Sequence, residues 1–210
     1  TLKKTSFTVK SFDGTKIQCY QYKTPKGNKW NGKKHVAIVA HMLQSNHTSV
    51  LQYALLMMNA GYDVILFDQR QCGLSDRSLC TMGANESKDV GYIAKWVRAK
   101  YGNYVVLGLY GHSLGAATVC QYSSHDPNLA FLIEDCGYTS FKYLAKTIQK
   151  KFLPMVDFNE FYSAAKQYAA VGDTDYDDVN ALKSVKALDP NVPALFINGS
   201  GDHVADVSNA

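Results

Sequence analysis

Five short apolar runs recur along this chain of 210 residues. They are nearly continuous rather than alternating, and they cover residues 35–40 (HVAIVA), 62–67 (YDVILF), 104–110 (YVVLGLY), 130–134 (AFLIE) and 194–198 (ALFIN). A strand that is apolar on both faces is typical of a parallel sheet covered by helices on both sides. The runs therefore predict five strands of a buried parallel sheet.

Stretches with helical spacing lie between most of these runs, at about 48–60, 86–101, 114–124 and 139–152. Strands and helices in alternation predict a doubly wound α/β domain. Residues 5–22 precede it and turn at Asp13-Gly14, a dipeptide favoured in tight hairpins. We therefore expect a mostly parallel sheet that opens with an antiparallel hairpin.

Residues 155–182 do not fit this alternation, because they carry six acids and one lysine among scattered Phe and Tyr residues. A crossover between two strands needs only one helix and short loops. We predict one domain over residues 1–210, with a core of 1–152 and 183–210 and a small lid insertion of 153–182. One ordinary helix followed by a long acidic loop is the alternative.

The net charge of +4 is modest but unevenly distributed, with nine lysines and one acid, Asp13, in residues 1–34. These lysines are spread along an alternating pattern that is typical of solvent-exposed hairpins, and they do not cluster with aromatic residues. We therefore expect no nucleic-acid partner.

The cysteine pattern indicates reduced thiols. There are five, an odd number, with no C-x-x-C pair and no Cys/His cluster at metal spacing.

No apolar run approaches the roughly 20 residues that a membrane span needs, and no signal-peptide pattern opens the chain. We expect a cytoplasmic protein without metal or organic cofactor, while a leader or anchor removed before Thr1 remains open; the oligomeric state stays undetermined.

The candidate nucleophile lies in the sequence GHSLG, residues 111–115, which matches G-x-S-x-G. The motif directly follows an apolar strand and begins a helix rich in small residues, the context that a nucleophile elbow requires. Glycines are needed at both ends because the turn is too sharp for side chains there. Ser113 would then lie at the N-terminus of a helix, where the Leu114 N–H is a candidate oxyanion donor. The alternative is an ordinary serine N-cap.

Several segments now form a recognisable set: VAHMLQSN, FDQRQCGLSD, GHSLGAA, IEDCGYTS and INGSGDHV. Together they resemble the α/β-hydrolase superfamily, within it the single-domain serine hydrolases of the serine aminopeptidase-like and monoacylglycerol-lipase-like branch. The resemblance implies that Leu43 supplies the second oxyanion N–H, although Met42 stands where family members usually have glycine. It also implies that Asp68, Arg70 and Gly73 fix a loop.

The order in α/β hydrolases is Ser, acid, His. The resemblance implies that Asp202 is the acid, because it follows a late strand in the setting GSGDHV. Asp135, which follows the preceding strand, is the weaker alternative.

The chain holds six histidines for the base. Adjacent side chains on an extended turn diverge, so His203 is only a weak alternative beside Asp202. Family members carry the histidine further along the chain than this sequence reaches. We therefore expect the base beyond residue 210, and a C-terminally incomplete fold.

The leading functional hypothesis is a serine hydrolase of small carboxylic esters that forms a Ser113 acyl-enzyme. Met42, Phe158, Phe161 and Tyr162 are predicted to form an apolar substrate pocket, while packing of the lid onto the core would explain the aromatic residues equally well. A non-catalytic ligand-binding or interaction protein is the second hypothesis. Amide or peptide hydrolysis is the third.

Overall fold

The computed structural model describes residues 3–25 and 29–205, and one sheet dominates it. Within these residues the strands are β1 (Lys4–Lys10), β2 (Lys16–Tyr22), β3 (Lys29–Trp30), β4 (Lys33–Ala40), β5 (Asp63–Phe67), β6 (Val106–His112), β7 (Leu129–Asp135) and β8 (Ala194–Ile197). Their order is β1-β2-β5-β4-β6-β7-β8, with β3 paired to β4. The neighbours from β5 to β8 are parallel, and β1 and β2 form the antiparallel hairpin. The predicted fold class is therefore confirmed.

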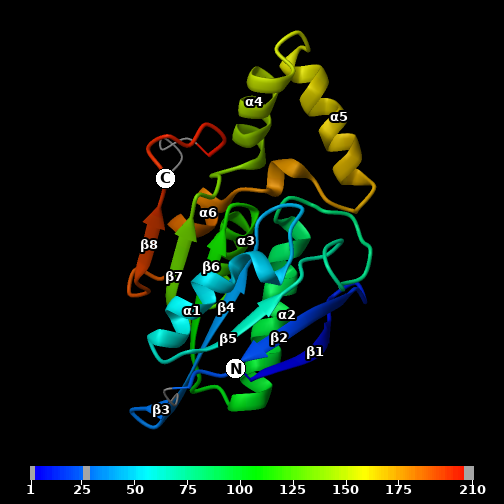
Figure 1. Ribbon diagram of the computed structural model, residues 1–210. Coiled ribbons are helices and arrows are strands. Elements are labelled where there is room, and N and C mark those ends of the chain that lie inside the picture. Colours follow the sequence, from blue (N-terminus) through cyan, green and yellow to red (C-terminus); the bar gives the residue numbers. More distant parts are fainter. Residues whose placement is uncertain (1–2, 26–28, 206–210) are drawn as a thin grey trace.

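Helices cover both faces of the sheet (Figure 1). They are α1 (Leu51–Asn59), α2 (Ala84–Tyr101), α3 (Leu114–Ser123), α4 (Phe141–Phe152), α5 (Phe158–Ala170) and α6 (Ala181–Lys186), with short 3₁₀ turns η1 (His47–Val50) and η2 (Tyr176–Asp178). Among the described residues, no helix combines the length and apolar composition that crossing a membrane requires.

The apolar core is divided by the sheet into two clusters, because successive side chains of a strand point to opposite faces. Ile38 and Leu109 belong to the cluster beneath α2 and α3, while Val39 and Tyr110 belong to the one beneath α1. All four side chains are buried. Full burial of a large apolar side chain contributes roughly 1.5–3 kcal/mol, so the two clusters hold the strand ends in fixed positions.

The edge strand β8 differs from the rest of the sheet because its apolar side chains are open to solvent. Leu195, Phe196 and Ile197 are 53%, 42% and 41% exposed, whereas Leu132 of the neighbouring β7 is fully buried. Phe196 points to the face that carries α3 and α6, and its two neighbours point to the face that carries α1. Among the described residues, both faces of β8 are thus partly open to solvent.

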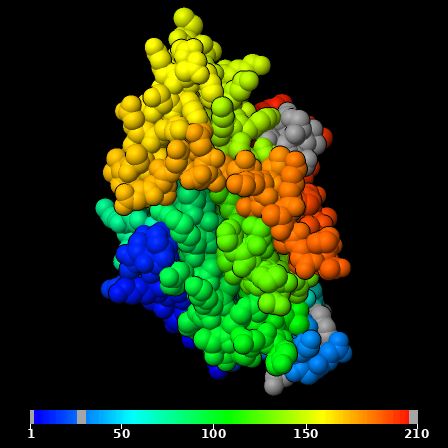
Figure 2. Space-filling model, turned by 180° about the vertical axis from the view of Figure 1, so that it is seen from behind, coloured from blue at the N-terminus to red at the C-terminus, as the bar shows by residue number. Residues whose placement is uncertain are grey.

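Helices α4 and α5 form a hairpin, residues 141–170, that projects beyond the carboxyl ends of the strands (Figures 1 and 2). Each helix begins at a side-chain cap: Ser140 accepts the Tyr143 N–H at 3.3 Å, and Asp157 accepts the Asn159 N–H at 2.8 Å. The projecting unit begins at α4, which the sequence assigned to the core, and so starts earlier than the predicted boundary at residue 153.

Candidate active site

Ser113 lies in a sharp turn between β6 and the first residue of α3. Its backbone angles are φ 56° and ψ −117°, which a residue with a side chain seldom adopts. The Ser113 N–H donates to the Asp135 carbonyl at 2.8 Å, and the Ala116 N–H donates to the Ser113 carbonyl at 2.9 Å. These bonds hold the strained geometry that the sequence motif leads one to expect.

Two glycines make the turn sterically possible. A Cβ on Gly111 would lie 2.2 Å from the Gly115 carbonyl oxygen, and a Cβ on Gly115 would lie 2.3 Å from the Ala40 carbonyl oxygen. Both distances are far below van der Waals contact, and both contacts are with backbone atoms that have little room to move. The elbow therefore packs α3 directly against the end of β4, with no space for a side chain at either position.

His41 fixes the loop that follows β4. The imidazole is fully buried, its Nε2 accepts the Gln69 N–H at 2.9 Å, and its Nδ1 lies 2.6 Å from the Met42 carbonyl oxygen. Burial lowers the pKa of His41, so the ring is neutral and carries its proton on Nδ1. Both ring nitrogens are thus occupied by backbone groups, which makes His41 a structural residue.

The two candidate oxyanion donors come from this loop and from the elbow. Leu114 is the first residue of α3, where backbone N–H groups lack intrahelical acceptors. Leu43 lies two residues beyond His41 and is 43% exposed. Met42 is not among the residues with positive φ; Gln44 adopts that conformation, with φ 52°. Replacement of the usual glycine by Met42 therefore introduces no backbone strain.

Asp68 ties three segments together at the carboxyl end of β5. Its buried carboxylate accepts the His47 N–H at 2.9 Å, the Leu74 N–H at 2.9 Å and the Tyr20 hydroxyl at 3.1 Å. The His47 ring also contacts it, with Nδ1 at 2.8 Å. This contact makes His47 a half-buried partner of the Asp68 carboxylate. A Cβ on Gly73 would lie 2.2 Å from the same carboxylate, so only glycine fits there.

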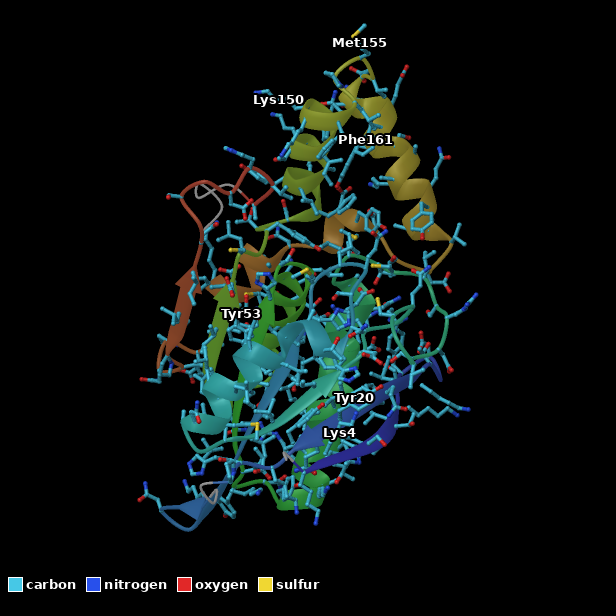
Figure 3. All side chains as sticks on the ribbon, viewed as in Figure 1. Lys4, Tyr20, Tyr53, Lys150, Met155 and Phe161 are labelled. Atoms are coloured by element: carbon cyan, nitrogen blue, oxygen red, sulfur yellow. The ribbon has the colours of Figure 1, made fainter. Side chains whose placement is uncertain are left out.

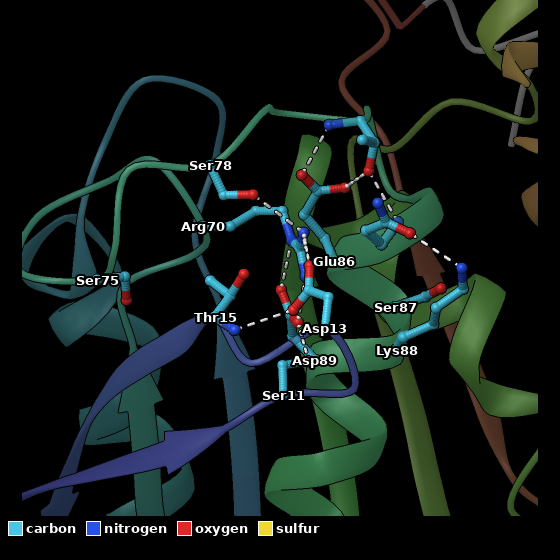
Figure 4. A network of polar contacts seen from close by, with 12 residues as sticks. Ser11, Asp13, Thr15, Arg70, Ser75, Ser78, Glu86, Ser87, Lys88 and Asp89 are labelled. Atoms are coloured by element: carbon cyan, nitrogen blue, oxygen red, sulfur yellow. Dashed lines mark hydrogen bonds and ion pairs between the residues drawn. The ribbon is translucent and has the colours of Figure 1, made fainter. Parts of the chain in front are cut away.

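Arg70 is almost fully buried and binds two carboxylates (Figure 4). Its guanidinium donates to Asp89 through Nε at 2.9 Å and Nη2 at 2.7 Å, and to Asp13 through Nη1 at 3.0 Å. Burial lowers the pKa of Arg70, but the two carboxylates outweigh that effect and raise it, so the charge is permanent. The contacts join the β1–β2 turn to α2 and to the loop after β5.

Asp202, the candidate acid, follows β8 in a tight turn. Its carboxylate accepts the Val204 N–H at 2.7 Å and the Ala205 N–H at 3.0 Å. The turn lies beside Cys136: burial raises the pKa of that thiol, and the carboxylates of Asp135 and Asp202 raise it further. His203 is exposed to solvent.

Asp135 and His112 form a pair that sequence reasoning did not find. They are register partners at the ends of β7 and β6, so their side chains lie on the same face of the sheet. The His112 Nδ1 is 3.2 Å from an Asp135 carboxylate oxygen, which also accepts the Tyr110 hydroxyl. Tyr53 of α1, labelled in Figure 3, stacks on Tyr110 at 4.8 Å between ring centroids and completes this cluster.

The remaining histidines lie away from Ser113. His35 is near the amino end of β4, and His125 is exposed just beyond the end of α3. Both positions are at the opposite end of the sheet from the elbow.

The comparisons with known proteins agree with this geometry. A family model described as alpha/beta hydrolase fold matches residues 43–130, which contain the Ser113 elbow and the loop fixed by Asp68. The chain has the α/β-hydrolase fold. The fold that the resemblance implies is thereby confirmed, whereas the branch within the superfamily stays a prediction.

Solved structures with the same hydrolase fold resemble nearly the whole chain. The Pyrococcus furiosus esterase Pf2001 superposes with a TM-score of 0.73 at 19% identity, covering 99% of this chain and 74% of that one. XC6422 from Xanthomonas campestris, described as an α/β serine hydrolase without lid, gives 0.63 at 20% identity, covering 99% and 76%. The acylaminoacyl peptidase of Pyrococcus horikoshii gives 0.69 at 15%, covering 100% and 34%.

A relative by sequence is the uncharacterized protein YqkD of Bacillus subtilis strain 168. It is 26% identical over 221 residues, which include 99% of this chain and 66% of YqkD. This hydrolase-fold chain therefore spans just under two thirds of that relative's length.

A cavity of about 550 Å³ opens at the carboxyl end of the hydrolase sheet. It is lined by residues of the loops after β4 and β5 and by two tyrosines of the 158–182 region: Leu43, Gln44, Ser45, Gln71, Cys72, Gly73, Cys80, Met82, Tyr168 and Tyr176. The wall is a mixture of polar and apolar groups, and Leu43 brings a candidate oxyanion donor to it.

The residues predicted to form the substrate pocket lie elsewhere. Tyr162 is buried and stacks on Phe158 at 5.5 Å and on Phe141 at 6.1 Å, and Phe161 packs against the same core cluster. Met42 is half-buried and, like these three, is absent from the lining of the cavity. The aromatic residues of α5 therefore pack the hairpin. The sequence could not distinguish this from a pocket, because a stripe of aromatic residues at helical spacing is compatible with both.

Proposed function

We propose that this chain carries the nucleophile and the acid of a serine hydrolase that acts on carboxylic esters. Ser113 Oγ attacks the ester carbonyl, its proton passes to a base, and the alcohol leaves to give an acyl-enzyme that water then hydrolyses. The main support is the elbow: a serine at φ 56° on the N-terminus of α3, cleared by two glycines.

The oxyanion is stabilised by the N–H groups of Leu114 and Leu43 and by the positive end of the α3 dipole. Removal of one such donor typically costs about 2.7–4 kcal/mol in the transition state. The support for Leu43 is its place in the cavity wall, in a loop held by the buried His41.

Asp202 orients a base that, in our proposal, is a histidine outside residues 1–210. Among the described histidines, His41 has both ring nitrogens engaged and His112 faces Asp135. The open faces of β8 also support this view, because an apolar strand at a sheet edge is ordinarily covered by further chain.

Residues 141–182 act as a lid in this proposal, since Tyr168 and Tyr176 of that region line the cavity. We place the protein in the monoacylglycerol-lipase-like or serine aminopeptidase-like branch; its structural neighbours include esterases and an acylaminoacyl peptidase.

Labelling with a fluorophosphonate tests the proposed function. A longer chain that includes the proposed C-terminal histidine should form an adduct at Ser113 and hydrolyse p-nitrophenyl acetate, whereas its Ser113→Ala variant should do neither. The 210-residue chain should be slower by a factor on the order of 10⁶, the usual cost of a missing triad histidine. No adduct in the longer chain would refute the enzyme and favour a non-catalytic binding protein.

The two candidate acids are separated by matched substitutions in the longer chain. Asp202→Asn should reduce kcat by a factor on the order of 10⁴, as loss of the orienting acid does in serine proteases. Asp135→Asn should have a much smaller effect, because that carboxylate is engaged with Tyr110 and His112. The reverse ranking would assign the acid to Asp135.

A further inference from the structure

The tip of the α4–α5 hairpin is a continuous exposed segment, Lys150–Asp157. Met155 is 96% exposed and Phe152 is 62% exposed, with Leu153 at 41% and Val156 at 37%. Figure 3 shows Met155 pointing outward at the end of the hairpin. Single exposed apolar residues are ordinary, but a contiguous group on a protruding tip indicates an interaction surface.

The rest of α4 has its apolar residues buried. Phe141, Leu144 and Ala145 of its first half belong to the core cluster, and Ile148 packs against it. The helix is thus anchored at its base. The tip is therefore exposed although the helix that carries it is firmly packed. The hairpin holds four apolar side chains in water at a defined position.

The same region is strongly basic. Lys142, Lys146, Lys150 and Lys151 are all exposed on α4, and the sequence from residue 141 to residue 156 contains no acid. The acid at the tip, Asp157, accepts backbone N–H groups at the start of α5. Lysines therefore flank the apolar tip on the α4 side, where Figure 3 labels Lys150.

We propose that this tip binds the surface of an anionic phospholipid bilayer. A convex apolar protrusion flanked by lysines fits a bilayer, because the apolar side chains enter the acyl boundary while the ammonium groups contact lipid phosphates. Each lysine near an anionic membrane strengthens binding about fivefold. The chemistry recognised is a negatively charged headgroup layer above hydrocarbon.

The location of the tip gives the contact a consequence. The hairpin stands at the carboxyl end of the sheet (Figure 1), the end at which the β6–α3 turn carries Ser113 and the loops after β4 and β5 line the cavity. Bilayer binding would bring that end to the lipid. This consequence rests on the proposed function. The binding itself does not, because vesicle binding is measured without any enzymatic activity.

Co-sedimentation of the 210-residue chain with vesicles tests the proposal. We expect binding to vesicles of phosphatidylcholine with phosphatidylserine, weaker binding to phosphatidylcholine alone, and release by added salt. Met155→Asp should weaken binding at least about tenfold, since a carboxylate replaces an inserted apolar group. Lys150→Glu with Lys151→Glu should weaken it by at least about 25-fold, from about fivefold per lysine.

Matched controls lie at the opposite end of the sheet. Tyr104 is 84% exposed just before β6, and Lys33 is exposed at the start of β4. Tyr104→Asp and Lys33→Glu should change vesicle binding by less than about twofold, as surface substitutions away from an interface do. Circular dichroism establishes that each variant is folded.

Equal binding to neutral and anionic vesicles would overturn the proposal, and so would the absence of binding to either. If vesicle binding is absent and Met155→Asp abolishes a monomer–dimer equilibrium, the tip would be assigned to a second copy of the chain.

Discussion

Glu134 is a buried carboxyl group whose ionisation should make stability depend on pH. It is 8% exposed, lies near the end of β7 and faces a largely apolar cavity of about 270 Å³ between α3 and α6. The Gly137 N–H donates to it. Burial raises the pKa of Glu134 from 4.5 to about 7, with a smaller contribution from Asp135, while the Gly137 N–H opposes the shift.

The size and sign of the effect follow from this shift. At low pH both the folded and the unfolded chain hold the proton, and the group costs nothing. Between about pH 4.5 and 7 the folded state holds more protons, so the free energy of unfolding falls as the pH rises. Above that range the buried carboxylate costs the folded state about 3 kcal/mol, from roughly 2.5 pKa units at 1.36 kcal/mol each.

Glu134→Gln isolates this cost, because the amide keeps an acceptor for the Gly137 N–H and carries no charge. In urea unfolding followed by circular dichroism, the variant should be more stable than the parent by about 1 kcal/mol near pH 5 and about 3 kcal/mol near pH 8. Glu160→Gln on the exposed face of α5 is the control and should show no such trend. Equal differences at the two pH values would mean that Glu134 ionises as it does in water, and the reasoning would fail.

Two further substitutions test the packing of the site. Gly115→Ala should destabilise the fold by about 1–3 kcal/mol or more and abolish Ser113 labelling, because the added Cβ would lie 2.3 Å from the Ala40 carbonyl oxygen. Gly201→Ala is the control: its Cβ would meet nothing within 4 Å, so thermal unfolding should be unchanged. Arg70→Met should lower the free energy of unfolding in urea by about 3–5 kcal/mol, since it leaves Asp89 charged and buried. Adding Asp89→Leu should recover most of that loss, and no recovery would contradict the ion-pair explanation.

The order of strands and helices was predictable because burial on both faces dictates nearly continuous apolar runs. The run predicted at 62–67 is β5, Asp63–Phe67, and the helix predicted at 114–124 is α3, Leu114–Ser123. The elbow was predictable for a similar reason: two glycines around a serine have few other uses between a strand and a helix. Local pattern and global fold agree at these positions.

The projecting hairpin was predicted only in part, because periodicity says which face of a helix is apolar but not what that face meets. The apolar face of α5 suggested a substrate pocket, and instead Tyr162 packs between Phe158 and Phe141. Likewise, α4 reads as an ordinary crossover helix, and nothing in its sequence says that it leaves the sheet. Tertiary contacts decided both cases.

Contacts across strands were beyond prediction because they depend on register. His112 meets Asp135, and Glu134 meets Phe196, only because β6, β7 and β8 pair with those residues side by side. A shift of one residue would turn every side chain to the other face.

The same register links the candidate nucleophile to the candidate acid. The Ser113 N–H donates to Asp135 and the Cys136 N–H donates to Ile197, each at 2.8 Å, so the Asp202 turn is tied to the elbow through β7. The ladder is well fixed at β7, whose Leu132 is fully buried, and poorly fixed at β8, whose faces are open. Because buried contacts hold a side chain more firmly than an exposed edge does, the turn that carries Asp202 is held less firmly than the elbow that carries Ser113.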